Sequence, residues 1–247
     1  MVILENMKKF IILAALMLAG ACVGQKDDPE ELPDGPAKPD TPAVVSGTCL
    51  LLDFTGTWCV NCPRMETAIE EAMEQHPGLI VPVSVHCLNL DPLAVLPLSS
   101  DLAARFGVTG YPSVVIDLEK GSLFSATSAD LIVSRCNSAL AARGKAAKLT
   151  VELSGTTASV TAKVNQKGNY TLHMLVLEDG VVAPQTGGSE QHVHNNVLRS
   201  WIDSEEYKGL GTWDEIMFAR GVILGENQRI VAFACRDGIV NSVVQYP

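Results

Sequence analysis

The sequence has few positively charged residues relative to its acidic ones. Its 247 residues carry 18 Lys and Arg against 28 Asp and Glu, which gives a formal net charge of −10 at pH 7. An acidic surface repels phosphate backbones, so we expect no nucleic-acid partner. Seven cysteines are too few for a disulfide-built scaffold at this length. A P-loop, a dinucleotide-binding fingerprint and a hydrolase serine motif are also missing.

The sequence has no apolar segment near its N-terminus that is long enough to span a bilayer. Two lysines precede an apolar run over residues 10–18, and small residues and Cys22 follow. A spanning helix needs about 20 apolar residues, whereas this pattern is typical of a secretory signal peptide. The residues before Cys22 resemble a bacterial lipobox, with Ala19 where leucine is usual. We expect a lipoprotein signal peptide over 1–21 and a lipid on Cys22; the alternative is a plain secretory signal with an incidental cysteine.

Residues 22–45 are expected to form an extended tether. They contain five of the thirteen prolines and many acidic residues, so they cannot bury apolar surface. The run Lys26-Asp27-Asp28 resembles the acidic signals of surface lipoproteins in Bacteroides-type bacteria; the alternative is an ordinary soluble linker. The predicted location is the cell envelope, as an outer-membrane lipoprotein that faces the periplasm or the surface.

Residues 46–145 alternate between strand and helix patterns. Apolar runs predict strands at 49–54, 79–85 and 113–117, and residues 122–125 are expected to pair back on the third. Periodic apolar faces predict helices at 60–75, 100–106 and 128–143, the last capped by Ser128 and stopped by Gly144. The order predicts an α/β domain.

Residues 146–247 have a different pattern. Strands are expected at 148–153, 158–164, 170–177, 229–235 and 241–246, and turn residues separate the first three. No long helix interrupts them, which predicts an all-β, immunoglobulin-like sandwich domain. The stretch 178–228 has no readable pattern. Without a recognisable catalytic cluster, this domain is expected to position or select partners.

The chemical centre of the sequence is Cys59-Val60-Asn61-Cys62. It lies where a strand ends and a helix begins, which is the placement that thiol-disulfide chemistry requires. Unpaired backbone N–H groups at a helix N-terminus stabilise a thiolate on Cys59. Two intervening residues let Cys62 close a disulfide without large strain.

Four features together resemble the thioredoxin superfamily. Trp58 precedes the first cysteine, Asp53 lies six residues before it, and the Cys59/Cys62 pair follows. The stretch from Arg105 to Pro112 resembles the segment that ends in the family's cis-proline. The resemblance covers residues 46–145 and implies a thioredoxin-like fold.

Roles for the site residues follow from thiol chemistry and the resemblance. Cys59 is the expected nucleophile and Cys62 the resolving thiol. Asp53 is expected to be a buried carboxyl with a raised pKa that takes the Cys62 proton; the alternative is a strand-end acid bound to a backbone N–H. Trp58 shields the pair or simply packs. Pro112 is expected to be cis and to place the Tyr111 backbone against the disulfide; the alternative is a trans turn proline.

The whole chain also resembles a narrower group. These are lipoproteins related to the twenty-eight-kilodalton outer-membrane protein of Bacteroides-type bacteria. The resemblance rests on Phe54-Thr55-Gly56, on Cys59 to Pro63, on His192 to Arg199 and on Ile230 to Phe233. It implies a thioredoxin-like domain followed by a β-rich one, without a settled substrate.

The remaining cysteines are Cys49, Cys87, Cys136 and Cys235, and the sequence does not fix their pairing. Cys49 and Cys87 are expected at opposite ends of adjacent parallel strands, too far apart to bond. Cys136 lies on the apolar face of its predicted helix, and Cys235 on the apolar face of its predicted strand. We therefore expect most of these thiols to be free and buried.

His192 and His194 have the spacing that places two imidazoles on one face of a strand. Without a third ligand we favour a structural role over a metal site.

Two functions remain open. The first is a lipid-anchored thiol-disulfide oxidoreductase of the cell envelope that acts on protein thiols or disulfides, with no cofactor besides its Cys59-Cys62 disulfide. The second is a redox-inactive surface binding or adhesion lipoprotein on a thioredoxin-like scaffold. The cysteine pair, Asp53 and Pro112 favour the first function. The β domain and the predicted location at the cell surface favour the second.

Overall fold

The computed structural model describes residues 47–125, 127–144 and 146–246. The expected signal peptide at 1–21, the tether at 22–45 and the lipid attachment at Cys22 lie outside the described residues. Among the residues that are described, no helix is both long and apolar enough to cross a membrane.

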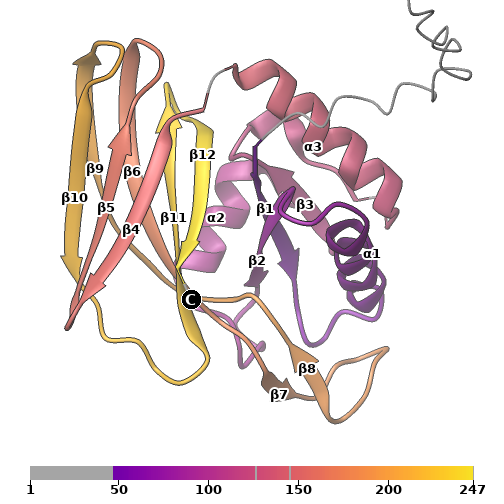
Figure 1. Ribbon diagram of the computed structural model, residues 1–247. Coiled ribbons are helices and arrows are strands. Elements are labelled where there is room, and N and C mark those ends of the chain that lie inside the picture. The colour runs from indigo at the N-terminus through magenta and orange to yellow at the C-terminus, as the bar shows by residue number, and fades with distance from the viewer. Residues whose placement is uncertain (1–46, 126, 145, 247) are drawn as a thin grey trace, which may run out of the picture. The chain divides into compact units, whose positions relative to one another are not determined.

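The first half of the described chain is a layered α/β structure around strand β1 (Figure 1). β1 pairs in parallel with β2 and antiparallel with β3. All seven residues of β1 are buried, as its continuous apolar run predicts. The elements are β1 (Cys49–Thr55), α1 (Cys62–Gln75), β2 (Ile80–His86), α2 (Leu98–Phe106), β3 (Ser113–Ile116), the 3-10 helix η1 (Lys120–Ser122) and α3 (Ala129–Arg143).

Both faces of β1 are covered by helices. Cys49 and Leu51 belong to a core that includes residues of α1 and α3, whereas Leu50 and Leu52 belong to a core that includes residues of α2. Side chains alternate between the two faces of a strand, so β1 contributes to both cores. The helices therefore fix β1, and with it the loop that carries the cysteine pair.

Helix α1 begins later than its sequence pattern predicted. Its first residue is Cys62 rather than Val60, and a tight turn from Cys59 to Cys62 precedes it. Pro63 lies in the first helical turn, where the missing N–H has no intrahelical partner to lose. Cys59 therefore lies just before the helix N-terminus, and Cys62 is the first residue of the helix rather than one turn inside it.

The second half of the described chain is a β sandwich, as predicted. The sheet β10-β5-β4 faces the strands β12, β11, β6 and β9 across a core that includes Tyr170, Met174 and Phe218. The strands are β4 (Lys148–Ser154), β5 (Thr157–Lys163), β6 (Gly168–Glu178), β7 (Val181–Ala183), β8 (His192–His194), β9 (Val197–Leu210), β10 (Glu215–Gly221), β11 (Gln228–Arg236) and β12 (Ile239–Tyr246). Strands β7 to β10 lie within residues 178–228, for which the sequence pattern predicted no secondary structure.

The two halves share a sheet and a core. β9 pairs in parallel with β2 at Val197 and Ser84, which joins their strands in the order β12-β11-β6-β9-β2-β1-β3. Phe106 of α2 packs in one cluster with Leu175 and Phe233 of the sandwich. Figure 1 accordingly shows α2 between β1–β2 and β11–β12. This junction brings the β7–β8 hairpin to the end of β1 where the cysteine pair lies.

Candidate redox site

The predicted cysteine pair forms a disulfide. Cys59 and Cys62 are bonded, and their Cα atoms lie 5.5 Å apart. Both residues are buried, with exposed fractions of 5% for Cys59 and 2% for Cys62. The pair follows β1 through the loop Gly56-Thr57-Trp58. The position agrees with the sequence prediction, but the low exposure means that a partner must approach a well-covered disulfide.

The loop before the pair is held by specific contacts. The backbone N–H of Thr57 donates to Asp91 Oδ2 over 2.8 Å, and the N–H of Cys59 donates to the Gly56 carbonyl over 3.0 Å. The Trp58 indole N–H donates to the Cys87 carbonyl over 3.0 Å. A side chain on Gly56 would put its Cβ 2.5 Å from the Trp58 indole nitrogen, so this position requires glycine.

Trp58 and Tyr111 meet beside the pair. Their rings pack edge to face with centroids 5.1 Å apart. The Tyr111–Pro112 peptide bond is cis, as the resemblance implied. Tyr111 has its pKa raised to about 12, chiefly by burial and then by interaction with Cys87. The cis-proline is therefore present, and its neighbour Tyr111 packs on Trp58, the residue before Cys59.

Asp53 is a buried carboxyl below the pair. It is 4% exposed, and its Oδ1 atom has no hydrogen-bond partner. Burial, followed by the charge of Glu66, raises its pKa to about 8. Asp53 and Cys62 line one small cavity of about 20 Å³, which is enough space for a water molecule. The Asp53 carboxyl and Cys62 therefore border the same small cavity.

The β7–β8 hairpin of the sandwich packs on the redox loop, which the sequence did not predict. The side-chain amide of Gln185 donates to the carbonyls of Gly56 and Cys59, over 3.2 and 2.9 Å. The N–H of Thr186 donates to the Thr57 carbonyl over 2.8 Å. The sandwich thus contributes directly to the surroundings of the disulfide.

Glycine allows the hairpin to approach this closely. Gly187 has φ +80°, and a Cβ there would lie 2.4 Å from the Val60 carbonyl oxygen. Both the backbone conformation and the space exclude a larger residue. The hairpin tip therefore rests on the backbone between the two cysteines.

A chain of polar side chains lies beside this contact. His192 Nε2 is 2.7 Å from Glu66 Oε2, which ties β8 to α1. The His192 and His194 rings are 4.7 Å apart between centroids, and His194 lies 5.1 Å from the His86 ring. His86 in turn contacts Asp91 over 3.0 Å. Burial, followed by the neighbouring histidines, lowers the pKa of His194 to about 4.

His192 and His194 each contact another part of the protein, Glu66 and the Ala183 carbonyl respectively. Within the described part of the chain, no group of three or more His, Cys, Asp or Glu residues is arranged to hold a metal ion. The spacing of His192 and His194 identified them in the sequence. Gln185, Asp91 and Glu66 carried no comparable signal, because their importance depends on contacts with distant parts of the chain.

Besides the pair, the described residues include four cysteines, and all four are free and buried, as expected. Cys49 and Cys87 lie at opposite ends of the β1–β2 pair. Burial raises the pKa of Cys87 to about 11 and that of Cys235 to about 12. High thiol pKa values leave little thiolate at neutral pH, so these residues are poor competitors for the chemistry of the pair.

Comparisons with known proteins agree with this geometry. Residues 42–131 match the family model for thioredoxin. Protein disulfide isomerase-like 5-3 of Oryza sativa is 30% identical over 74 residues, which are 30% of this chain and 16% of that protein. The chain therefore matches about a sixth of that relative's length.

Two solved structures show the same fold over most of this chain. HBP35 of Porphyromonas gingivalis has a TM-score of 0.67 at 18% identity, covering 81% of this chain and 74% of its own. A protein of Agrobacterium tumefaciens has a TM-score of 0.59 at 11% identity, covering 80% of this chain and 92% of its own. These likenesses establish a thioredoxin-like fold followed by a β region. They confirm, for the fold, the predicted resemblance to thioredoxin-like proteins of Bacteroides-type bacteria.

Proposed function

We propose that this thioredoxin-like protein is a thiol-disulfide oxidoreductase of the bacterial cell envelope, anchored by a lipid on Cys22. The observation that carries the proposal is the Cys59–Cys62 disulfide at the N-terminus of α1, above a buried carboxyl. The fold provides a scaffold for disulfide exchange, and the pair provides the reactive group. Asp53 provides a proton acceptor that is separated from Cys62 only by a small cavity.

The proposed reduction of a partner takes two steps. In the dithiol form, the Cys59 thiolate attacks one sulfur of the partner's disulfide, and the other partner sulfur leaves as a thiolate and takes a proton. Asp53 then accepts the Cys62 proton, and the Cys62 thiolate attacks the Cys59 sulfur. The second partner sulfur leaves, and the Cys59–Cys62 disulfide is restored. Two electrons pass to the partner, and the reverse sequence oxidises a partner dithiol.

The position of Cys59 favours its role as nucleophile. It lies three residues before the first residue of α1, where the positive end of the helix dipole stabilises negative charge. A lower thiol pKa raises the thiolate fraction near neutral pH. Cys62 is the first residue of α1 and is the proposed resolving thiol.

The envelope location is proposed from the N-terminal sequence. Cys22 follows an apolar run and small residues, and a Pro-rich acidic stretch follows it. We expect the mature chain to begin at a lipidated Cys22, so that intact mass of membrane-extracted protein shows the acyl chains. A Cys22→Ser variant is expected to leave the membrane fraction. Retention of that variant in the membrane would contradict the anchor.

A second function is favoured by one observation. The hairpin covers the pair, and both cysteines are at most 5% exposed, as a structural disulfide would be. In that case the protein is a redox-inactive surface binding lipoprotein.

The reduction potential of the pair separates the two functions. We expect a value above about −270 mV, in the range of exchangeable pairs, whereas structural disulfides fall below about −300 mV. The measurement equilibrates the full chain in glutathione or dithiothreitol buffers and counts free thiols by alkylation and mass. The Cys59→Ser/Cys62→Ser double variant is the control and must show no transition. A potential below about −300 mV would reject the oxidoreductase in favour of the binding protein.

A further inference from the structure

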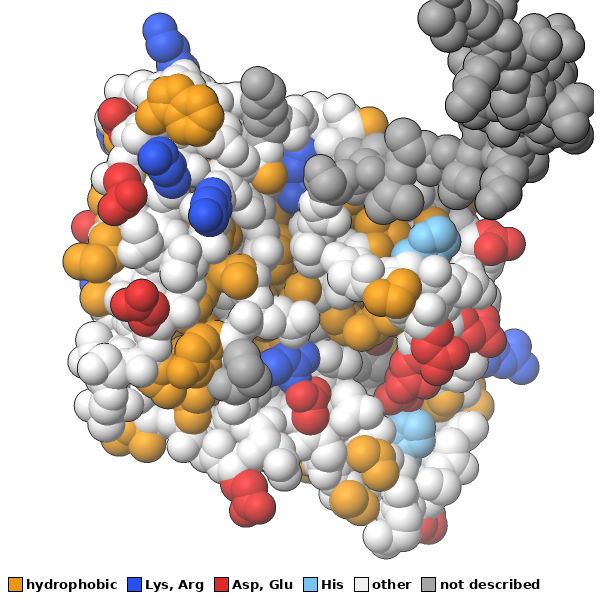
Figure 2. All heavy atoms as spheres, in the orientation of Figure 1, with side chains coloured by type: hydrophobic (Ala, Val, Ile, Leu, Met, Phe, Trp, Pro, Cys, Tyr) orange, Lys and Arg blue, Asp and Glu red, His pale blue; other side chains and the backbone are white. Residues whose placement is uncertain are grey.

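A cleft of about 530 Å³ lies beside the redox site, between α1 and the segment that leads into β9. One wall carries Glu66, Glu70 and Glu74. Residues four apart on a helix point to the same side, so these three carboxyl groups form a row. Figure 2 shows acidic side chains gathered over α1 on the visible face.

The cleft combines this acidic row with apolar surface. Ile69 and Met73 of α1 line the cleft together with the carboxyl groups. A lysine or arginine side chain is complementary to such a lining, because it has an apolar stem and a cationic end. The size and the mixed acidic and apolar lining of the cleft therefore fit an amphipathic cation better than a free metal ion or a wholly apolar group.

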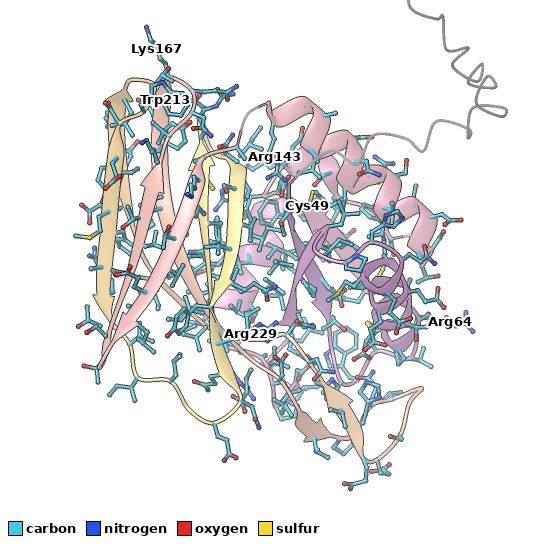
Figure 3. All side chains as sticks on the ribbon, viewed as in Figure 1. Cys49, Arg64, Arg143, Lys167, Trp213 and Arg229 are labelled. Carbon is cyan, nitrogen blue, oxygen red and sulfur yellow. A yellow bond between two sulfur atoms is a disulfide. The ribbon has the colours of Figure 1, made fainter. Side chains whose placement is uncertain are left out.

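The negative charge of the cleft is largely uncompensated. Among the described residues, no lysine or arginine forms an ion pair with the acidic row, and only His192 contacts it, through Glu66. Arg64, also on α1, projects away from the body of the protein (Figure 3). The pKa of Glu70 is raised, first by burial and then by the charges of Glu66 and Glu74.

Asp53 provides a second, independent observation, which is a buried carboxyl oxygen without a hydrogen-bond donor. It lines the same cleft, it is 4% exposed, and its Oδ1 atom has no hydrogen-bond partner in the described structure. A buried carboxyl oxygen without a donor is uncommon, because the loss of water is then not offset. A cationic group bound in the cleft would lie beside the Asp53 carboxyl.

We propose that the cleft is a subsite for a lysine or arginine side chain of the polypeptide partner. The inference rests on the proposed function, because the cleft shares Asp53 and Glu66 with the small cavity beside Cys62. A basic side chain bound there belongs to a chain that also lies close to the disulfide. The subsite thus selects partners that carry a basic residue near their own cysteines.

The test measures binding to the oxidised full chain by calorimetry, without turnover. The probe is the peptide acetyl-Gly-Leu-Lys-Leu-Gly-amide, and the reference peptide has norleucine in place of lysine. We expect the lysine peptide to bind about fivefold more tightly, the size expected of a few partly exposed ion pairs. The preference should shrink at high salt, which screens exposed charges.

Variants of α1 provide a matched control. Glu70→Gln/Glu74→Gln is expected to abolish the preference for lysine, whereas Glu71→Gln should retain it. Glu71 is an exposed acid on the same helix that does not line the cleft. The exposed positions of Glu70 and Glu74 mean that the fold tolerates both changes. Equal binding of the two peptides by the unaltered protein, or an equal loss in Glu71→Gln, would overturn the subsite.

Two further arms separate the possible failures. Exchange with the uncharged bis(2-hydroxyethyl) disulfide tests the proposed function alone. If this exchange occurs and the peptides are not distinguished, only the subsite is rejected; if the peptides are distinguished and no exchange occurs, only the oxidoreductase is rejected. Spermine serves as a free cation, and tighter binding of spermine than of the lysine peptide would overturn the assignment to a polypeptide.

Discussion

Replacing Cys62 with Ser is expected to trap partner proteins as mixed disulfides on Cys59. The first attack still occurs in this variant, but the thiol that resolves the intermediate is gone. Cys59→Ser should trap far less, because Cys62 is the first residue of the helix and is assigned to resolve the mixed disulfide rather than to form it. Both variants should lose catalytic insulin reduction. Non-reducing gels of envelope fractions, with mass spectrometry of the trapped species, measure the outcome.

A buried free thiol provides the control for this experiment. Cys136 lies on the inner face of α3 and is fully buried. Cys136→Ala should leave insulin reduction intact and trap nothing, with a modest loss of stability from the smaller side chain. Equal trapping by Cys59→Ser and Cys62→Ser would contradict the assignment of Cys59 as nucleophile.

Asp53→Asn is expected to change the pH dependence of stability more than any other single substitution at the site. Burial raises the pKa of Asp53 to about 8, against about 3.9 in an unfolded chain. Between these values the folded protein holds a proton that the unfolded chain releases, so folding stability falls as pH rises through this window. Below the pKa of Asp53 in the unfolded chain, the carboxyl is protonated in both states and the free energy of unfolding no longer depends on its titration.

The size of this effect is large enough to measure. Relative to the unaltered protein, Asp53→Asn should gain roughly 4 kcal/mol in free energy of unfolding between pH 4 and pH 8, because each pKa unit corresponds to about 1.4 kcal/mol. Urea unfolding of the oxidised proteins at pH 4, 6 and 8 provides the measurement. Glu152→Gln removes an exposed carboxyl on β4 and is the control. A pH-independent difference between Asp53→Asn and the unaltered protein would contradict the raised pKa.

The same substitution should slow the second chemical step. Without the Asp53 carboxylate, the Cys62 proton has no acceptor in the adjoining cavity, and the mixed disulfide should resolve on the order of 100-fold more slowly. In the unaltered protein the rate should rise with pH up to about 8, as Asp53 loses its proton. Stopped-flow measurement of the mixed disulfide's decay checks both statements. Resolution at an unchanged rate in Asp53→Asn would remove Asp53 from the mechanism.

The sequence alone determined the elements that depend on local pattern. The apolar run of β1, the capping of α3 by Ser128 and its end at Gly144 follow from residues next to one another. The pair Cys59 and Cys62 was recognised from its spacing at a strand–helix junction, whereas Asp53 and Pro112 were assigned through the resemblance to the thioredoxin superfamily. The structure then placed Asp53 and Cys62 at one cavity.

Strand β9 shows why the stretch 178–228 was unreadable. β9 pairs with β6 through three register shifts, and its C-terminal part carries exposed charged residues. An irregular ladder disrupts the alternation of polar and apolar side chains by which a strand is recognised. Its pairing relies on backbone hydrogen bonds to a distant strand, and these leave no mark on the local sequence.

Only the tertiary structure decided what surrounds the disulfide. Gln185 reaches the Cys59 carbonyl across 126 positions in the sequence, and the Thr186 N–H binds the Thr57 carbonyl. The acceptors in these contacts are backbone carbonyls, which every residue has. The residue types in the redox loop therefore do not predict the contacts. The acidic cleft likewise exists because the pairing of β9 with β2 brings the segment before β9 to α1. Local spacing determined the reactive pair, whereas long-range backbone pairing determined its enclosure and the cleft beside it.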